Sequence, residues 1–255
     1  MRVVIVGYGQ MGHEIEIVLR NRGHEIVGIV DPVKPGASAL TVDEAAKAIA
    51  GSPGTGPVVA IEFALPEGVA GNVAAYGRAG WSAVIGTTGW EDQKTEVLTN
   101  AADTGMNLVY GSNFSVGANL FVRLARYAAR LSARTGEYDA ALVELHHRRK
   151  KDSPSGTALM VAEALKEEFP DKTEIQPETL HRRVKPEELH VIAGRVGSVP
   201  GTHTVILDSV ADTVELTHRA RSRQGFAVGA VQAAEWITEQ TGIHPVEAFF
   251  DDMFQ

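Results

Sequence analysis

The chain has 255 residues, enough to bury a full hydrophobic core in one large domain or two smaller ones. Its formal net charge is −8, so its surface as a whole should repel nucleic acids and anionic membranes, and we expect neither as a partner. It contains no cysteine, which excludes disulfides and thiolate metal sites and agrees with a cytoplasmic location. A site for an anionic ligand must therefore come from a local cluster of cations or backbone N–H groups.

Strand-like and helix-like segments alternate through the first hundred residues, which is typical of a parallel sheet covered by helices. The predicted elements are strands at Val3–Val6, Ile26–Val30, Val58–Phe63, Ala83–Ile85 and Asn107–Tyr110, helices at His13–Asn21 and Val42–Ile49, and a turn at Gly51–Pro57. Ile15, Val18 and Leu19 should form the inner face of the first helix. Each strand ends in a polar or glycine-containing loop, where open parallel sheets bind ligands.

The pattern changes after Asn113. The later part is predicted to contain an amphipathic helix at Asn119–Arg134 with Leu120, Leu124, Ala128 and Leu131 on one face, a strand at Ala140–Leu145, a helix at Ser155–Glu168, an exposed connection at Pro170–Glu188, strands at Val191–Ala193, His203–Leu207 and Val214–Ala220, and a helix at Ala227–Gln240. We therefore predict an α/β fold with two domains. A Rossmann-type parallel-sheet domain would comprise residues 1–116 and 224–255, and a smaller α+β domain with an open mixed sheet would comprise 117–223.

The first strand leads into a glycine-rich loop that opens the first helix. Its sequence is Gly7-Tyr8-Gly9-Gln10-Met11-Gly12, a G-x-G-x-x-G pattern. Glycines there allow a tight turn, close approach of the backbone to a pyrophosphate and tight packing of helix on strand. Asp31 follows 19 residues after Gly12, at the end of the second strand, where an acidic residue binds a ribose hydroxyl. Loop and acid together predict a dinucleotide site.

Two further loops follow predicted strands and contain small polar residues. They are Gly86-Thr87-Thr88-Gly89 and Gly111-Ser112-Asn113-Phe114. Either would suit the nicotinamide side of a cofactor site, and either is equally compatible with an ordinary loop.

Six consecutive basic or potentially basic residues occupy positions 146–151, and the turn Ser153-Pro154-Ser155-Gly156-Thr157 follows closely. A solvated basic stretch and a nucleic-acid patch are both possible interpretations of such a run. The turn, however, leads into a helix whose N-terminal N–H groups attract anions, and His146 and Lys150 are four residues apart. These features favour a small-molecule carboxylate site with proton-transferring groups beside it.

The segment from Glu144 to Ala158 closely resembles the signature of the dihydrodipicolinate reductase family, E-x-H-H-x-x-K-x-D-x-P-S-G-T-A. The resemblance extends to the loops at 86–89 and 112–117, to 201–204 and to 216–223, so it covers most of the chain. It implies reduction of 4-hydroxy-tetrahydrodipicolinate by NADH or NADPH to tetrahydrodipicolinate, in lysine and diaminopimelate biosynthesis.

The resemblance also implies roles for individual residues. His146 would be the catalytic acid/base and Lys150 the proton donor, while His147, Gly156 and Thr157 would bind the dicarboxylate substrate. The cofactor would be bound by Gly7, Tyr8, Gly9, Gln10, Met11, Gly12, Asp31, Gly86, Thr87, Thr88, Gly111, Ser112, Asn113 and Phe114. Residues 117–223 would bind substrate and join four subunits into a homotetramer. No metal ligand is implied.

This sequence departs from the family pattern in three places. The glycine loop is one residue shorter than usual, with Gln10 where a basic residue is common. Glu62-Phe63-Ala64 replaces Asp-Phe-Ser/Thr, and Thr202 stands where glutamate is frequent. Gln10 and the charge of Asp31 together predict a preference for NADH over NADPH, which Lys34 in the next loop would soften.

Two alternatives share parts of this pattern. Another Rossmann amino- or oxo-acid dehydrogenase, such as an aspartate or homoserine dehydrogenase, would share the glycine loop and Asp31 but would not need the segment at 146–157. A dinucleotide-sensing regulator would use the basic run to bind DNA with steep salt dependence and would show no turnover.

Overall fold

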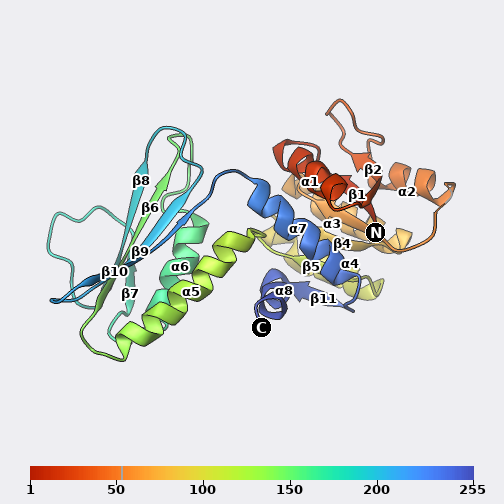
Figure 1. The fold of residues 1–255 in the computed structure, drawn as a ribbon. Coiled ribbons are helices and arrows are strands. Elements are labelled where there is room, and N and C mark those ends of the chain that lie inside the picture. Colours follow the sequence, from red (N-terminus) through yellow and green to blue (C-terminus); the bar gives the residue numbers. More distant parts are fainter. Residues whose placement is uncertain (53) are drawn as a thin grey trace. The chain divides into compact units, whose positions relative to one another are not determined.

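The computed structural model describes residues 1–52 and 54–255, so Pro53, in the predicted turn at Gly51–Pro57, lies outside the described residues. The chain divides into two compact units (Figure 1). Unit 1 comprises Met1–Val116 and Arg223–Gln255, and unit 2 comprises Gly117–Ser222. Each unit contains one sheet with its own buried apolar core.

Unit 1 is built on a six-stranded sheet in the order β11-β5-β4-β3-β1-β2, in which every neighbouring pair is parallel. The strands are β1 (Arg2–Val6), β2 (Glu25–Val30), β3 (Val58–Glu62), β4 (Ser82–Ile85), β5 (Leu108–Tyr110) and β11 (Ile243–Pro245). The chain starts in the middle of the sheet, moves outward on one side, and then crosses to the other side. This reversal of strand order marks where parallel sheets bind ligands, beyond the carboxyl ends of the strands.

Helices cover both faces of this sheet because alternate side chains of a strand point to opposite faces. Val4 and Val6 belong to the core cluster under α2 (Val42–Ala50), α3 (Val69–Ala79) and α4 (Lys94–Asp103). Val3 and Ile5 belong to the cluster under the other three helices, which are α1 (Gln10–Asn21), α7 (Gln224–Ile237) and α8 (Val246–Met253). Ile15, Val18 and Leu19 are buried, which confirms the predicted inner face of α1.

Unit 2 is built on a five-stranded mixed sheet in the order β10-β9-β6-β8-β7. Its strands are β6 (Asp139–His146), β7 (Glu174–Gln176), β8 (Glu188–Arg195), β9 (Thr202–Asp208) and β10 (Thr213–Arg219). The β6–β8 and β7–β8 pairs are parallel, whereas β6–β9 and β9–β10 are antiparallel. The predicted fold class, a Rossmann-type sheet plus a separate open mixed sheet, is confirmed.

Two helices, α5 (Val116–Ala133) and α6 (Gly156–Lys166), pack on one face of the second sheet. The leucines predicted to share a face of α5 do so, but Leu120, Leu124 and Leu131 are exposed. The buried face of α5 instead carries smaller side chains and one aromatic ring, at Phe121, Val122, Ala125 and Ala129. Small residues let the helix lie close to the sheet, which the leucine spacing could not reveal.

Three short elements differ from the prediction. The segment Pro170–Glu188, predicted as an exposed connection, contains the edge strand β7. β11 and α8, near the C-terminus, were not predicted at all. β7 and β11 have three residues each and lack the continuous apolar run that marks the equally short β5 (Leu108–Tyr110), so their pairing depends on neighbours distant in sequence.

Among the helices formed by residues 1–52 and 54–255, none combines the length and the apolar character needed to cross a membrane.

Candidate active site

The glycine loop between β1 and α1 has the geometry of a phosphate cradle. Gly7 has a φ of +88°, and a Cβ there would lie 2.3 Å from the carbonyl oxygen of Phe63. A Cβ on Gly12 would lie 2.3 Å from the Gly7 carbonyl oxygen, so helix and loop touch. Gly9, in contrast, has no protein atom within 4 Å of a Cβ position, and as N-cap of α1 it offers no side-chain cap. The loop therefore leaves space and backbone N–H groups for an anion beside Gly9.

Asp31 lies beside this loop and its carboxylate orders the local backbone. Oδ2 accepts a hydrogen bond from the N–H of Tyr8 at 2.8 Å, and Oδ1 accepts from the N–H groups of Val33 and Lys34, each at 2.9 Å. Burial raises the pKa of Asp31, but these three bonds outweigh it, so its pKa lies below the usual value. Asp31 is thus an anion with lone pairs left for ribose hydroxyls.

The two further loops lie at the carboxyl ends of β4 and β5, where the sequence places them. Thr87, Thr88, Gly111 and Ser112 line a cavity of about 250 Å³, together with aromatic residues that include Trp90 and Tyr110.

Other predicted cofactor residues have structural roles. A Cβ on Gly86 would lie 2.1 Å from the Phe63 ring. The buried Phe114 packs edge-on against that ring, and Asn113 accepts a hydrogen bond from Ser115. The Phe114 side chain therefore belongs to the hydrophobic core.

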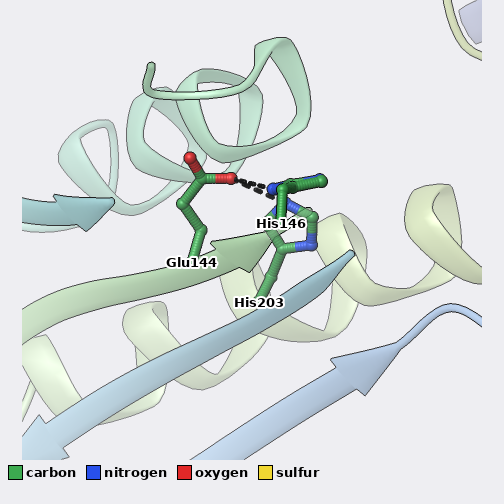
Figure 2. A group of neighbouring side chains, drawn as sticks. All are labelled: Glu144, His146 and His203. Carbon is green, nitrogen blue, oxygen red and sulfur yellow. Dashed lines mark ion pairs between the residues drawn. The ribbon is translucent and has the colours of Figure 1, made fainter. Parts of the chain in front are cut away.

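In unit 2, β6 ends with two polar side chains on the face that packs against the helices. Glu144 and His146 are two residues apart in the strand and therefore point the same way, and both are buried (Figure 2). His146 Nδ1 lies 2.5 Å from Glu144 Oε2. The other oxygen, Oε1, accepts hydrogen bonds from the Ser155 N–H at 3.1 Å and from Arg195 Nη2 at 2.9 Å.

His203, on β9, completes this cluster. Its Nε2 lies 3.2 Å from Ser155 Oγ and 3.8 Å from Glu144 Oε2. Ser155 is the N-cap of α6, and its hydroxyl oxygen accepts a hydrogen bond from the N–H of Ala158. The start of α6 is therefore tied directly to the histidine cluster.

Lys150 lies close enough to this cluster for its charge to lower the pKa of His146. Its ammonium nitrogen is 2.8 Å from Asp152 Oδ1. Lys150, together with the N–H group of Gly156, lowers the pKa of Asp152, so that residue is an anion.

The three predicted substrate-binding residues lie around the start of α6 and the end of β6. Gly156 is exposed, and a Cβ there would meet no atom within 4 Å, which leaves room for a ligand. Thr157 is half-buried in the first turn of α6. The buried Nδ1 of His147 has no hydrogen-bond partner among residues 1–52 and 54–255. These groups can bind a carboxylate through backbone N–H, hydroxyl and imidazole donors.

The charge states of the cluster follow from burial and from its cations. Desolvation lowers the pKa of His146, and Lys150 and Arg195 add to this, while Glu144 opposes it. Burial also lowers the pKa of His203, to about 4. Burial alone would raise the pKa of Glu144, but hydrogen bonds from Ser155 and Arg195 bring it below its usual value. Near neutral pH the cluster therefore consists of one carboxylate and two neutral imidazoles.

The same three residues each offer a possible metal-ligand atom, all within 4.8 Å of one another. Two observations weigh against a cation there. Glu144 already accepts hydrogen bonds from Arg195 and Ser155, and the positive charges of Arg195 and Lys150 lie beside it. The arrangement suits proton transfer better than metal binding.

Sequence reasoning assigned no role to Glu144, Asp152, Arg195 or His203. Glu144 carried one usable signal, an acidic residue at two-residue spacing from a histidine inside an otherwise apolar strand. Arg195 and His203 are 51 and 59 residues distant from Glu144, and only the pairing of β6 with β8 and β9 brings them together.

Comparison with known families agrees with this geometry. Residues 1–114 match the model for the N-terminal part of dihydrodipicolinate reductase, and residues 117–250 match the model for its C-terminal part. The chain belongs to the dihydrodipicolinate reductase family. Over 257 residues and the full length of both chains, it is 34% identical to the 4-hydroxy-tetrahydrodipicolinate reductase of Christiangramia forsetii. It is 36% identical over 248 residues to that of Methanoregula boonei, with 95% of each chain covered.

Among solved structures, a dipicolinate-bound dihydrodipicolinate reductase from Paenisporosarcina sp. TG-14 matches with a TM-score of 0.76 at 23% identity, covering 96% of this chain and 97% of the other. GenD2 from gentamicin A biosynthesis, solved in complex with NAD, matches with a TM-score of 0.56 at 14% identity, covering 94% and 85%. At these identities the matches establish the fold alone.

The depressed pKa of His203 predicts an acid-sensitive fold. The unfolded chain takes up this proton near pH 6.5, whereas the folded chain takes it up only near pH 4. Between these values the unfolded state binds more protons, so the free energy of unfolding decreases as the pH is lowered. Between pH 7.5 and pH 5 this histidine should remove about 2 kcal/mol from the free energy of unfolding. Urea unfolding at both pH values, compared with His203→Gln, measures the effect. An equally steep loss in the variant would show that other groups cause it.

Proposed function

We propose that this protein reduces 4-hydroxy-tetrahydrodipicolinate to tetrahydrodipicolinate, with loss of water, by transfer of a hydride from a reduced nicotinamide dinucleotide and uptake of a proton, as a step of lysine and diaminopimelate biosynthesis. Unit 1 would bind the dinucleotide and unit 2 the dicarboxylate substrate. The observation that carries the proposal is the segment from Glu144 to Thr157, which gathers a buried histidine, a lysine and an open helix start. The proposal includes a cytoplasmic location, which agrees with a cysteine-free chain.

The residues of unit 1 fit a dinucleotide. The open space beside Gly9 and the uncapped start of α1 suit a pyrophosphate, and Asp31 suits the adenosine ribose. Thr87, Thr88, Gly111 and Ser112, around their cavity, would meet the nicotinamide end. When bound, the cofactor supplies the hydride.

In unit 2, the start of α6 and His147 would bind the substrate's carboxylates. In the structure, Asp152 contacts the Lys150 ammonium group and the Gly156 N–H. When substrate binds, these two donors would instead contact a carboxylate or the ring nitrogen of the substrate. Lys150 would donate a proton as negative charge develops on that nitrogen, and His146 would act as acid/base at its Nε2. Two substrate carboxylates would raise the pKa of the neutral His146 and favour its protonated form.

We predict that Lys150→Met and His146→Gln each lower kcat by about 10²–10⁴-fold, the usual contribution of a general acid–base group. Binding of NADH, followed by its fluorescence, should stay near wild type because both residues belong to unit 2. The matched control is Lys151→Met, because Lys151 is an exposed cation of the same run and stands at a variable position of the family signature. Near-normal turnover in both test variants would refute these roles.

The cofactor preference rests on charge beside the glycine loop. Asp31 is held as an anion by three backbone N–H groups, so it would repel a phosphate on the adenosine ribose. Gln10, at the start of α1, adds no cation. Lys34 is exposed and its side chain would contribute about 0–1 kcal/mol as a surface ion pair, too little to reverse the preference.

We therefore predict a higher kcat/KM for NADH than for NADPH. Asp31→Asn keeps an acceptor for the loop N–H groups but removes the charge, so it should shift the ratio toward NADPH by about tenfold, or about 1.4 kcal/mol. Asp43→Asn removes an exposed carboxylate that pairs with Arg78, and should leave the ratio unchanged. A tenfold preference of the wild-type protein for NADPH would contradict the assignment.

The free face of the second sheet supports a further part of the proposal, a homotetramer. Both helices of unit 2 pack on the opposite face, and Leu145 and Ile192 are 38% and 45% exposed. They share this face with Val143 and Ile206, which are half-buried. Such an apolar sheet face is typical of a subunit interface.

Sedimentation velocity should therefore show a tetramer for the wild-type protein. Ile192→Glu places a charge in the middle of this face and should give smaller species. Val210→Glu, at the fully exposed turn after β9, is the matched control and should remain tetrameric. A wild-type monomer at micromolar concentration would refute the proposed assembly.

A further inference from the structure

The carboxylate of Glu144 has no exposed surface, yet it is ionised, with two hydrogen bonds to one oxygen and an imidazole nitrogen lying against the other. Oε1 is fixed by the Ser155 N–H and by Arg195, which come from the start of α6 and the end of β8. Oε2 lies 2.5 Å from His146 Nδ1. Figure 2 shows the carboxylate and the imidazole facing each other. Because Oε1 is fixed from two directions, the side chain cannot rotate away from the histidine without losing both bonds.

We propose that Glu144 is a positioning residue that holds His146 with its proton on Nδ1 and presents Nε2 as the atom that exchanges a proton during the reaction. This inference rests on the proposed acid/base role of His146. A carboxylate oxygen carries only lone pairs, and an unprotonated Nδ1 at 2.5 Å would place another lone pair against it, so the close approach favours a proton on Nδ1. In the neutral imidazole this leaves the lone pair on Nε2.

Nε2 has a defined place in the fold. It lies 2.9 Å from the position that a Cβ of Gly201 would take, and Gly201 has a φ of +153°. A larger residue there would be strained and would crowd this nitrogen. Glycine at position 201, directly before β9, therefore leaves the space beside Nε2 that a side chain would fill.

His203 has a different hydrogen-bond partner, Ser155, and therefore does not compete with His146 for Oε2. The Ser155 hydroxyl oxygen already accepts a bond from the Ala158 N–H, so its own proton is available to His203 Nε2. An acceptor role at Nε2 agrees with the neutral state that burial imposes on His203. With His203 3.8 Å from Oε2, His146 is the closer of the two imidazoles to that oxygen.

The charges that face His146 come from several elements. Glu144 favours its protonated form, whereas Lys150 in the following loop and Arg195 on β8 disfavour it. The neutral His203 on β9 separates it from His218 on β10, and Asp152 is paired with Lys150. Glu144 is thus the one anion in direct contact with His146 among the described residues, so its removal should lower the pKa of His146 further.

The test is Glu144→Gln. The glutamine oxygen would keep the bonds from Ser155 and Arg195, and its NH₂ group would then face His146 Nδ1 as a donor. The proton of the neutral imidazole should move to Nε2, the wrong nitrogen for the proposed chemistry. We expect kcat to fall by about 10²-fold or more, with KM nearly unchanged, and the His146 limb of the pH profile to move to lower pH.

A matched control is Glu188→Gln. Glu188 is also buried in unit 2, and its carboxylate accepts hydrogen bonds from Arg182 and from the N–H of Lys185, neither of which belongs to the His146 cluster. This variant should lose stability without any change in the tautomer of His146 or in the pH profile. A change in either would mean that a general loss of buried charge, and not the contact with Glu144, controls His146, which would refute the proposal.

Nitrogen NMR of the histidine side chains reads the tautomer without any need for activity. The His146 signals are assigned by their loss in His146→Gln. The wild-type protein near neutral pH should show a proton on Nδ1 and an unprotonated Nε2, and Glu144→Gln the reverse. The proposal is overturned if the proton of the neutral His146 lies on Nε2 in the wild-type protein, a measurement that does not depend on the folding of any variant. It is also overturned if Glu144→Gln leaves the tautomer unchanged, or reverses it without loss of turnover. Normal turnover of His146→Gln with the expected tautomer would instead refute the proposed acid/base role.

Discussion

Burying a carboxylate is the constraint around which unit 2 is organised, because a charge removed from water must be compensated by donors that the fold supplies. Three elements compensate the charge of Glu144: Ser155 at the start of α6 and Arg195 at the end of β8 donate hydrogen bonds to Oε1, and His146 on β6 lies against Oε2. Each donor fixes the end of its element at one place. The basic segment and the open helix start are therefore held beside the histidine by the same interaction that keeps the histidine oriented.

Much of the fold could be predicted because its cores follow short-range periodicity. Val3–Val6 alternates between the two faces of a parallel sheet, and Ile15, Val18 and Leu19 recur at helical spacing, so both patterns show in a window of a few residues. β7 and β11 have three residues each and no such pattern. On α5 the pattern was present but misleading, since the large leucines are exposed and the alanines face the sheet.

The site could be predicted only in part, for a related reason. His146, Lys150 and Gly156 lie within eleven residues, so their motif is visible in the sequence. What it could not show is that Lys150 is paired with Asp152, or that Arg195 and His203 meet at Glu144. The contacts of Arg195 and His203 depend on strand register, which places residues more than fifty positions from Glu144 on the same face of the sheet.

An acidic chain cannot rely on its overall electrostatic field to attract the anionic ligands proposed for it, and each of the two units offers an open helix start instead. In unit 1 the start of α1 is capped by Gly9, which has no side chain, so the N–H groups of the first turn and the open space beside Gly9 are left for a ligand. In unit 2 the start of α6 is capped by Ser155, but the neighbouring Gly156 remains exposed and Lys150 adds a cation. Backbone donors supply fixed partial charges without the desolvation cost of a buried cation, so a net charge of −8 is compatible with anion recognition at both places.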